Sequence, residues 1–229
     1  MAADTSMESS SLQQVLHHAR NADGIGSNTI KDLYDHWTGS YDTDLLKQNY
    51  QGPTKVSAVL SEHCTDKSAS ILDCGCGTGL IGEKLHALGY SNITGLDISQ
   101  KSLDVAEQKG VYNNLVCTEV GKEKMPFGED EFDAIICSGC ILPTHMRPSC
   151  FREWVRVVKP GGIIALAMRQ CYIEVVKGEE EYFSKDFQLE FGEVTQDLER
   201  SKSWQIISKT NFPQYYEGSL GLLVVSKVL

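Results

Sequence analysis

The chain has 229 residues, enough for one domain with a full hydrophobic core, and its apolar and charged fractions are ordinary for a soluble globular protein. Its formal net charge of −10 argues against a protein that grips the phosphate backbone of nucleic acid, which requires a basic face. The first residues lack the apolar core of a secretory signal, and the longest apolar stretch, Ile163 to Met168, is too short to span a bilayer. Eight cysteines without such a signal indicate reduced thiols, so we expect a cytoplasmic protein, with the nucleus as the alternative, and no membrane partner.

The chain predicts a polar segment followed by one α/β domain. Residues 1–28 are polar and rich in serine, so we expect them to be mobile, with a single domain over residues 29–229. Strands are predicted to end at Asp73 and Asp97 and to cover Leu115–Thr118, Ala134–Cys137, Ile163–Met168, Trp204–Thr210 and Leu222–Lys227. Helices are predicted at Pro53–Ser61, Leu80–Leu88, Gln100–Lys109, Pro148–Val158 and over most of Glu174–Arg200, with a turn at Lys159–Gly162. Short apolar strands alternating with helices imply a mostly parallel sheet in a three-layer sandwich, and the short final loop implies one reversed strand at the edge.

The first part of the domain, Ile30 to Gln51, is acidic and unusually rich in aromatic residues. Tyr34, Trp37 and Tyr41 are spaced to share one face if this stretch is helical. Two interpretations stay open. The aromatic face packs on the edge of the sheet, or the stretch at about 30–51 is a lid whose rings cover a bound cofactor.

The most informative motif is Ser70 to Leu80, SILDCGCGTGL, where an apolar run ends at Asp73 and glycines follow at every second residue. A glycine turn between a strand and a helix lets a ligand lie against the backbone beside unpaired N–H groups. A dinucleotide fingerprint would place its third glycine where Leu80 stands, and an acid at Asp73 would repel a pyrophosphate. The same acid suits a ligand with an ammonium group and no phosphate. The motif therefore predicts S-adenosylmethionine.

A second carboxylate, Asp97, closes the second strand 24 residues after Asp73. That spacing suits a carboxylate that accepts both hydroxyl groups of a ribose, while Ser99 is better placed to cap the helix that follows. Glu119 or Val120, just past the third strand, stands where an adenine edge would arrive.

The stretch Ser138 to His145 after the fourth strand is expected to face the transferred methyl group. It contains neither the Asn/Asp-Pro-Pro-aromatic tetrad nor the Pro-Cys pair typical of enzymes that methylate nucleic-acid bases, which favours a small-molecule or protein acceptor. His145 is a candidate general base or a solvated loop residue. Arg169, at the end of the fifth strand, is a candidate to hold an acceptor carboxylate or to form a plain ion pair.

Four cysteines, Cys74, Cys76, Cys137 and Cys140, would approach one another if the first and fourth strands are neighbours. The spacing of the last two resembles that of a metal site. Because cysteine in an apolar strand behaves as a small hydrophobe, we expect no metal.

The run from Tyr34 to Arg169 resembles the class I S-adenosylmethionine-dependent methyltransferases, and more narrowly the methyltransferase-like proteins of the Williams–Beuren chromosome region. The resemblance rests on the aromatic and acidic motif at 34–44, ILDCGCGTGL, GLDIS at 95–99, FDAII at 132–136 and KPGG at 159–162. It implies a Rossmann-like sheet of order 3-2-1-4-5-7-6 with strand 7 antiparallel, cofactor contacts at Asp73, Gly75, Gly77 and Asp97, and an N-terminal lid through Trp37 and Tyr41. The acid usual after the third strand has no clean counterpart, and the family supplies no acceptor.

The expected reaction is methyl transfer to the N, O or S atom of an acceptor, most simply a small molecule and alternatively a protein. The rivals are a non-catalytic S-adenosylmethionine-binding protein and an NAD-dependent enzyme on a related sheet. The predicted cofactor-binding residues are Trp37, Tyr41, Asp73, Gly75, Cys76, Gly77, Gly79, Asp97, Ile98, Glu119, Val120 and Cys137. His145 and Arg169 are the candidates on the acceptor side.

Overall fold

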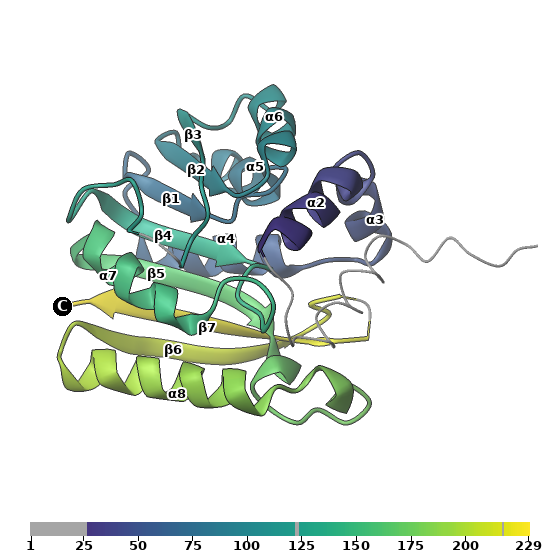
Figure 1. Ribbon diagram of the computed structural model, residues 1–229. Coiled ribbons are helices and arrows are strands. Elements are labelled where there is room, and N and C mark those ends of the chain that lie inside the picture. The colour runs from purple at the N-terminus through teal and green to yellow at the C-terminus, as the bar shows by residue number, and fades with distance from the viewer. Residues whose placement is uncertain (1–26, 122–123, 217) are drawn as a thin grey trace, which may run out of the picture.

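The computed structural model describes residues 27–121, 124–216 and 218–229, and a seven-stranded sheet runs through its centre (Figure 1). The strands, in chain order, are β1 Ile71–Cys74, β2 Ile93–Asp97, β3 Asn114–Cys117, β4 Phe132–Ser138, β5 Val158–Arg169, β6 Trp204–Pro213 and β7 Leu220–Val228. Their order in the sheet is β3-β2-β1-β4-β5-β7-β6, and β7 is antiparallel to both of its neighbours. The predicted fold class and strand order are confirmed. The reversed strand lies one place in from the edge, where the loop argument alone had put it at the edge.

Helices cover both faces of this sheet. They are α2 Ser27–Trp37, α3 Tyr41–Lys47, α4 Gly52–His63, α5 Leu80–Ala87, α6 Gln100–Gln108, α7 Phe151–Val157 and α8 Lys185–Arg200, with short 3-10 turns η1 Pro148–Cys150, η2 Gln170–Tyr172 and η3 Glu180–Tyr182. Helices α4 and α5 pack on one face through Val56, Leu60 and Leu85. Helices α7 and α8 pack on the other face through Trp154 and Phe191. The expected mobile segment, residues 1–28, lies outside the described ranges except for its last two residues.

The central parallel strands β1 and β4 are apolar because both of their faces are covered. All four residues of β1 are buried, and six of the seven in β4 are buried as well. Within the described ranges, no helix has the length and apolar character needed to cross a membrane.

The predicted turn at Lys159–Gly162 is wrong, because this stretch lies inside β5. Phe132 pairs with Val158 and Ala134 pairs with Ile163, so the intervening residues of β5 bulge out of register. A Cβ on Gly162 would lie 2.5 Å from a Val158 methyl group and 2.7 Å from the Asp133 carbonyl oxygen, which explains the glycine.

The aromatic stretch near the N-terminus forms two helices, α2 and α3, separated by a turn at 38–40. The predicted single helical face is therefore broken, yet the three rings still cluster. The ring centroids of Trp37 and Tyr41 lie 4.5 Å apart, and those of Tyr34 and Trp37 lie 6.0 Å apart. Figure 1 shows α2 and α3 beside the carboxyl ends of β1 and β4, the edge where parallel sheets bind ligands.

Candidate active site

A cavity of about 270 Å³ opens at the carboxyl ends of β1, β2 and β4, and residues of α2 and α3 also line it. This volume is near the lower end of the roughly 300–1,000 Å³ usual for small-molecule sites. Its walls are formed by Ile30, Tyr34, Tyr41, Gly75, Gly77, Thr78, Leu96, Asp97, Ile98, Ser102, Thr118, Glu119, Val120, Gly139, Cys140, Thr144, His145 and Met146.

The glycine turn after β1 forms the floor of the cavity, and two of its glycines explain its shape. Gly75 has φ +76°, and a Cβ at this position would lie 2.3 Å from the Cys140 sulfur, so the turn is pressed against the loop after β4. Gly77 has φ +53°, and a Cβ there would meet no atom within 4 Å. Both backbones are left-handed, which favours glycine. The turn thus leaves open space above Gly77, where a ligand can lie against the backbone.

Asp97 presents a carboxylate at the cavity wall, fixed by two backbone N–H groups. The amide nitrogens of Gly77 and Ser99 each donate to Asp97 at 2.9 Å. Burial raises the pKa of this carboxyl group from its ordinary value. Ser99 itself caps α6, because its hydroxyl oxygen accepts from the Ser102 amide, as the sequence predicted. Because Ser99 provides the helix cap, the Asp97 carboxylate can face a ligand in the cavity.

Asp73 lies behind the glycine turn and does not line the cavity. Its carboxyl group is fully buried, and the Tyr112 hydroxyl donates to Oδ2 at 2.7 Å while Oδ1 has no partner. The Tyr112 ring fills the space beside Gly82 and Gly95, where a Cβ would lie 2.4 Å and 3.0 Å from ring atoms. Burial raises the pKa of Asp73 to about 7, against the opposing effect of the Tyr112 hydrogen bond.

A chain of three side chains closes the other end of the cavity. The Tyr34 hydroxyl lies 3.0 Å from Nε2 of His145, and the Thr144 hydroxyl lies 2.9 Å from Nδ1 of the same ring. Burial lowers the pKa of His145 to about 4, so the imidazole is neutral at physiological pH. Tyr34 belongs to α2 and His145 to the loop after β4, so this contact joins the aromatic helices to the acceptor side.

Helices α2 and α3 are also tied to the cofactor side by polar contacts. Asp42 accepts from the Thr78 hydroxyl at 2.5 Å and from Nζ of Lys109 at 2.8 Å. Asp35 accepts from the Ser99 hydroxyl at 2.5 Å. We call α2 and α3 together, residues 27–47, the roof of the cavity.

The structure divides the predicted site residues into two groups. Those that line the cavity are Tyr41, Gly75, Gly77, Asp97, Ile98, Glu119, Val120 and His145. Those that lie outside its lining are Trp37, Asp73, Cys76, Gly79, Cys137 and Arg169. The buried Trp37 indole donates to Asp44 at 2.9 Å, so Trp37 supports the roof from behind. Gly79 caps α5 with φ +91°.

Several lining residues were not named as site residues from the sequence. The spacing of the aromatic residues could have pointed to Tyr34. The position of Cys140 and Thr144 after the fourth strand could have pointed to these two residues. Ser102 and Ile30 carried no such signal, because only the fold brings α6 and the start of α2 to this edge.

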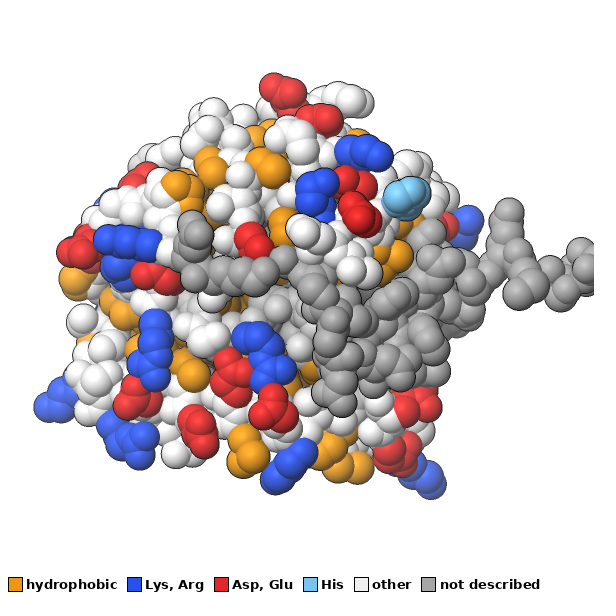
Figure 2. Space-filling model, viewed as in Figure 1, with side chains coloured by type: hydrophobic (Ala, Val, Ile, Leu, Met, Phe, Trp, Pro, Cys, Tyr) orange, Lys and Arg blue, Asp and Glu red, His pale blue; other side chains and the backbone are white. Residues whose placement is uncertain are grey.

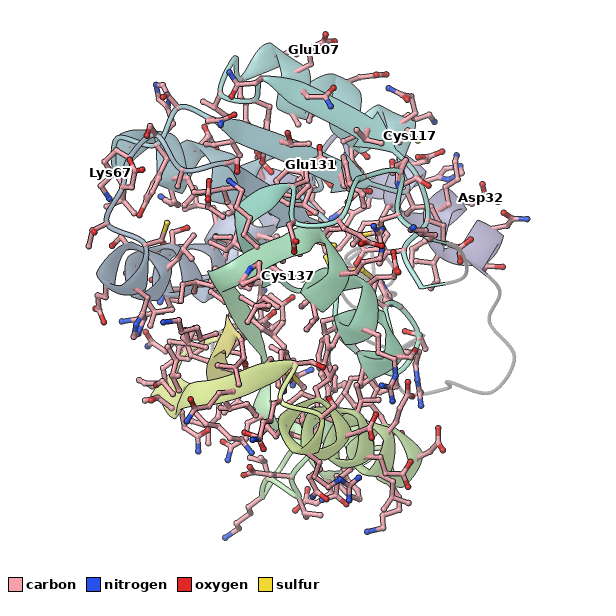
Figure 3. The ribbon with its side chains drawn as sticks, turned by 90° about the vertical axis from the view of Figure 1, so that its left-hand side faces the viewer. Asp32, Lys67, Glu107, Cys117, Glu131 and Cys137 are labelled. Atoms are coloured by element: carbon pink, nitrogen blue, oxygen red, sulfur yellow. The ribbon has the colours of Figure 1, made fainter. Side chains whose placement is uncertain are left out.

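The cysteines do not form a metal site. Cys74 and Cys137 are fully buried, and Figure 3 shows Cys137 in the interior of the molecule. Cys140 lines the cavity, and its thiol donates to the Gly75 carbonyl oxygen at 3.2 Å. Among the described residues, His, Cys, Asp and Glu side chains form no group able to hold a metal ion.

Comparisons with known proteins agree with this architecture. Residues 72–166 match the model of the methyltransferase domain family. Human methyltransferase-like protein 27 is 33% identical over 165 residues, which are 71% of this chain and 67% of the human protein. The chain belongs to the class I S-adenosylmethionine-dependent methyltransferases, and its cofactor is S-adenosylmethionine. Within that class, methyltransferase-like protein 27 is a relative that matches most of the chain.

Two solved structures share the fold. One is a chain from the complex between the Haloferax volcanii Trm112 methyltransferase activator and a methyltransferase, with TM-score 0.61, 17% identity and coverage of 85% of this chain and 97% of that one. The other is an S-adenosylmethionine-dependent methyltransferase from Methanosarcina mazei, with TM-score 0.56, 19% identity and coverage of 75% and 97%.

The residues present fit this cofactor. The open space above Gly77 admits a ligand to the backbone, and the Asp97 carboxylate is the right acceptor for ribose hydroxyl groups. Leu96, Ile98 and Val120 supply apolar surface on the same wall.

Proposed function

We propose that this chain methylates a small-molecule acceptor bound between the roof and the loop after β4. The observation that carries the proposal is the cavity itself, because the glycine turn, Asp97, Tyr34 and His145 all line it. A protein acceptor would need a segment thin enough to enter beneath the roof. On the face seen in Figure 2, acidic and basic side chains alternate, so the described surface there offers no continuous basic field for nucleic acid.

The roles of the residues follow from their positions. When bound, S-adenosylmethionine supplies a methyl group activated by the adjoining sulfonium. Gly77 and Asp97 would hold its ribose side, while Tyr34 and Tyr41 exclude water from above. Orienting two reactants in this way is worth roughly 7–11 kcal/mol of the barrier. Orientation by the cavity walls would therefore supply most of the acceleration.

His145 is the candidate to receive a proton from the acceptor, and its pKa sets limits on that role. A base with a pKa of about 4 is always ready to accept a proton at neutral pH, yet it is weak. It would remove the proton of an ordinary hydroxyl group poorly. This supports an acceptor that reacts without a strong base, such as a thiolate or a neutral amine. The hydrogen bond between the Tyr34 hydroxyl and Nε2 of His145 orients the ring for that encounter.

The proposal is tested in two stages. Titration calorimetry with S-adenosylmethionine, S-adenosylhomocysteine and NAD should show binding of the first two only; tight NAD binding without a response to the adenosyl compounds would contradict it. Incubation with labelled donor and separate metabolite and protein extracts should then label a small molecule. Label confined to protein would contradict the acceptor class, and failure with every extract would favour a binding protein without catalysis.

A further inference from the structure

Three buried side chains at the carboxyl end of β5 leave several hydrogen-bonding atoms unused. Arg169, Gln170 and Glu179 are 4%, 8% and 8% exposed. Nη2 of Arg169 donates to Oε1 of Glu179 at 2.6 Å, but Nε and Nη1 of Arg169, Oε1 of Gln170 and Oε2 of Glu179 have no partner. In the described ranges these are four of the eight buried side-chain atoms in that condition. A buried polar atom without a partner is costly, so such a concentration calls for a ligand.

This cluster lies next to the cavity. Ala167, two residues before Arg169, accepts from the amide of Gly139, which lines the cavity wall. The Tyr215 hydroxyl lies between the two regions, because it donates to the Ala167 carbonyl oxygen at 3.5 Å, and a Cβ on Gly139 would lie 3.6 Å from its oxygen. The unused atoms are therefore on the acceptor side of the sheet edge, opposite the end where Asp97 stands.

Arg169 determines the chemistry of the missing ligand. A guanidinium group with free N–H donors in a buried site binds a carboxylate most strongly among common organic groups. Glu179 already supplies one carboxylate, yet it uses a single oxygen, and it reaches Arg169 from the short segment between η2 and η3. Gly178, with φ +84°, directly precedes it and has the left-handed backbone that favours glycine.

We infer that Arg169 anchors a carboxylate group of the methyl acceptor, and that Glu179 occupies the same position when no acceptor is bound. This inference rests on the proposed function, since it names the chemical class of the acceptor for that site. If the two residues formed only a structural ion pair, removing either charge would destabilise the fold, and neither removal would improve the binding of an acid.

The opposite effects of removing each charge separate these two accounts. The full chain, saturated with S-adenosylhomocysteine, is titrated with acetate, benzoate and phenylacetate and with the matched amides acetamide, benzamide and phenylacetamide. Binding is followed by ligand-observed NMR and by the melting temperature. In Glu179→Gln, at least one acid should bind roughly tenfold more tightly than in the native protein and than its own amide. In the double variant Arg169→Gln/Glu179→Gln, which leaves no buried charge unpaired, this preference should disappear.

Asp197→Asn is the matched control, because it removes the same charge from an exposed ion pair. That pair joins Asp197 on α8 to Arg152 on α7. Absence of any acid preference in Glu179→Gln, or its persistence in the double variant, overturns the inference. Calorimetry with S-adenosylmethionine on the same samples keeps the outcomes apart. If the cofactor binds and the acids do not, only the acceptor class fails, whereas loss of cofactor binding in the native chain removes the proposed function.

Discussion

Tyr112 donates its hydroxyl hydrogen to Asp73 at 2.7 Å, and the two side chains seal each other beneath the glycine turn. The amide of Gly82 donates to the same hydroxyl oxygen at 3.2 Å. Asp73 is thus held inside the fold, behind the glycine turn and outside the lining of the cavity.

Asp73→Asn should stabilise the protein at neutral and higher pH. The folded pKa is about 7 and the unfolded value is near 4, so between these values the folded chain binds a proton that the unfolded chain does not. The native protein therefore loses stability as pH rises from 4 to 7, by up to about 4 kcal/mol. Urea unfolding of Asp73→Asn should lack this loss. Tyr112→Phe removes the donor that favours the charged form, so the loss should extend to higher pH and become larger in total. Identical pH profiles in all three proteins would show that Asp73 titrates normally.

The same variant should distinguish ligands with and without an ammonium group. At pH 8, above the pKa of about 7 of Asp73, Asp73→Asn should weaken binding of S-adenosylmethionine by about 1 kcal/mol, since the buried carboxylate attracts a cation across the turn. 5′-Methylthioadenosine lacks the amino acid part and should bind both proteins alike. Calorimetry with the two ligands measures the difference. Equal losses for both would mean that the substitution only deforms the turn.

Asp97→Asn should weaken cofactor binding by about 1–3 kcal/mol, because ribose hydroxyl groups would lose a charged acceptor. Asp97→Ala should cost at least as much, since the amides of Gly77 and Ser99 would also lose their acceptor. The control is Asp104→Asn at an exposed position on α6, where the carboxylate accepts from the Gln100 amide group. Unchanged affinity in Asp97→Ala would place the ribose elsewhere.

His145→Gln should flatten the acid side of the stability profile. The folded pKa is about 4 and the unfolded value is near 6.5, so within this window the unfolded chain binds the extra proton. Native stability should fall as pH drops from 6.5 to 4, by about 3 kcal/mol. Unfolding of His145→Gln should show no such fall, while His86→Gln, at an exposed position on α5, should follow the native curve. A native curve without this fall would mean that the ring is hydrated.

Asp42→Asn should release the roof. The substitution removes the charge that binds Lys109 and leaves only a neutral amide oxygen to accept from Thr78. This loss is worth about 1–2 kcal/mol and corresponds to roughly tenfold faster cofactor dissociation in stopped-flow experiments. Glu83→Gln is the matched control, because Glu83 also binds Lys109, at 2.8 Å, but belongs to α5. Equal acceleration by both variants would show that Lys109, and not the roof, governs release.

Much of the fold was predictable because the local sequence signals for turns and helix caps agree with the arrangement of strands in the sheet. The glycines at 75, 77 and 79 allow one kind of turn, and Ser99 caps α6 by a contact three residues away. Asp97 reaches the cavity because it ends a parallel strand, which the alternation of helices and strands already implied.

The rest depends on contacts between distant segments. Tyr112 reaches Asp73 only after α6 folds back on the sheet, so the acid motif alone did not show that its carboxylate is sealed. Gly39 separates α2 from α3, and Trp37 then turns toward Asp44 instead of the cavity. Glu179 and Arg169 meet across a loop whose path has no local signal.

The hydrogen bond between Tyr34 and His145 joins the roof of the cavity to the loop after β4. Because Tyr34 lies on the roof and His145 on the loop after β4, any movement that lifts the roof from that loop must break this contact. A roof that opened in each turnover to exchange the cofactor would therefore break and remake it every time.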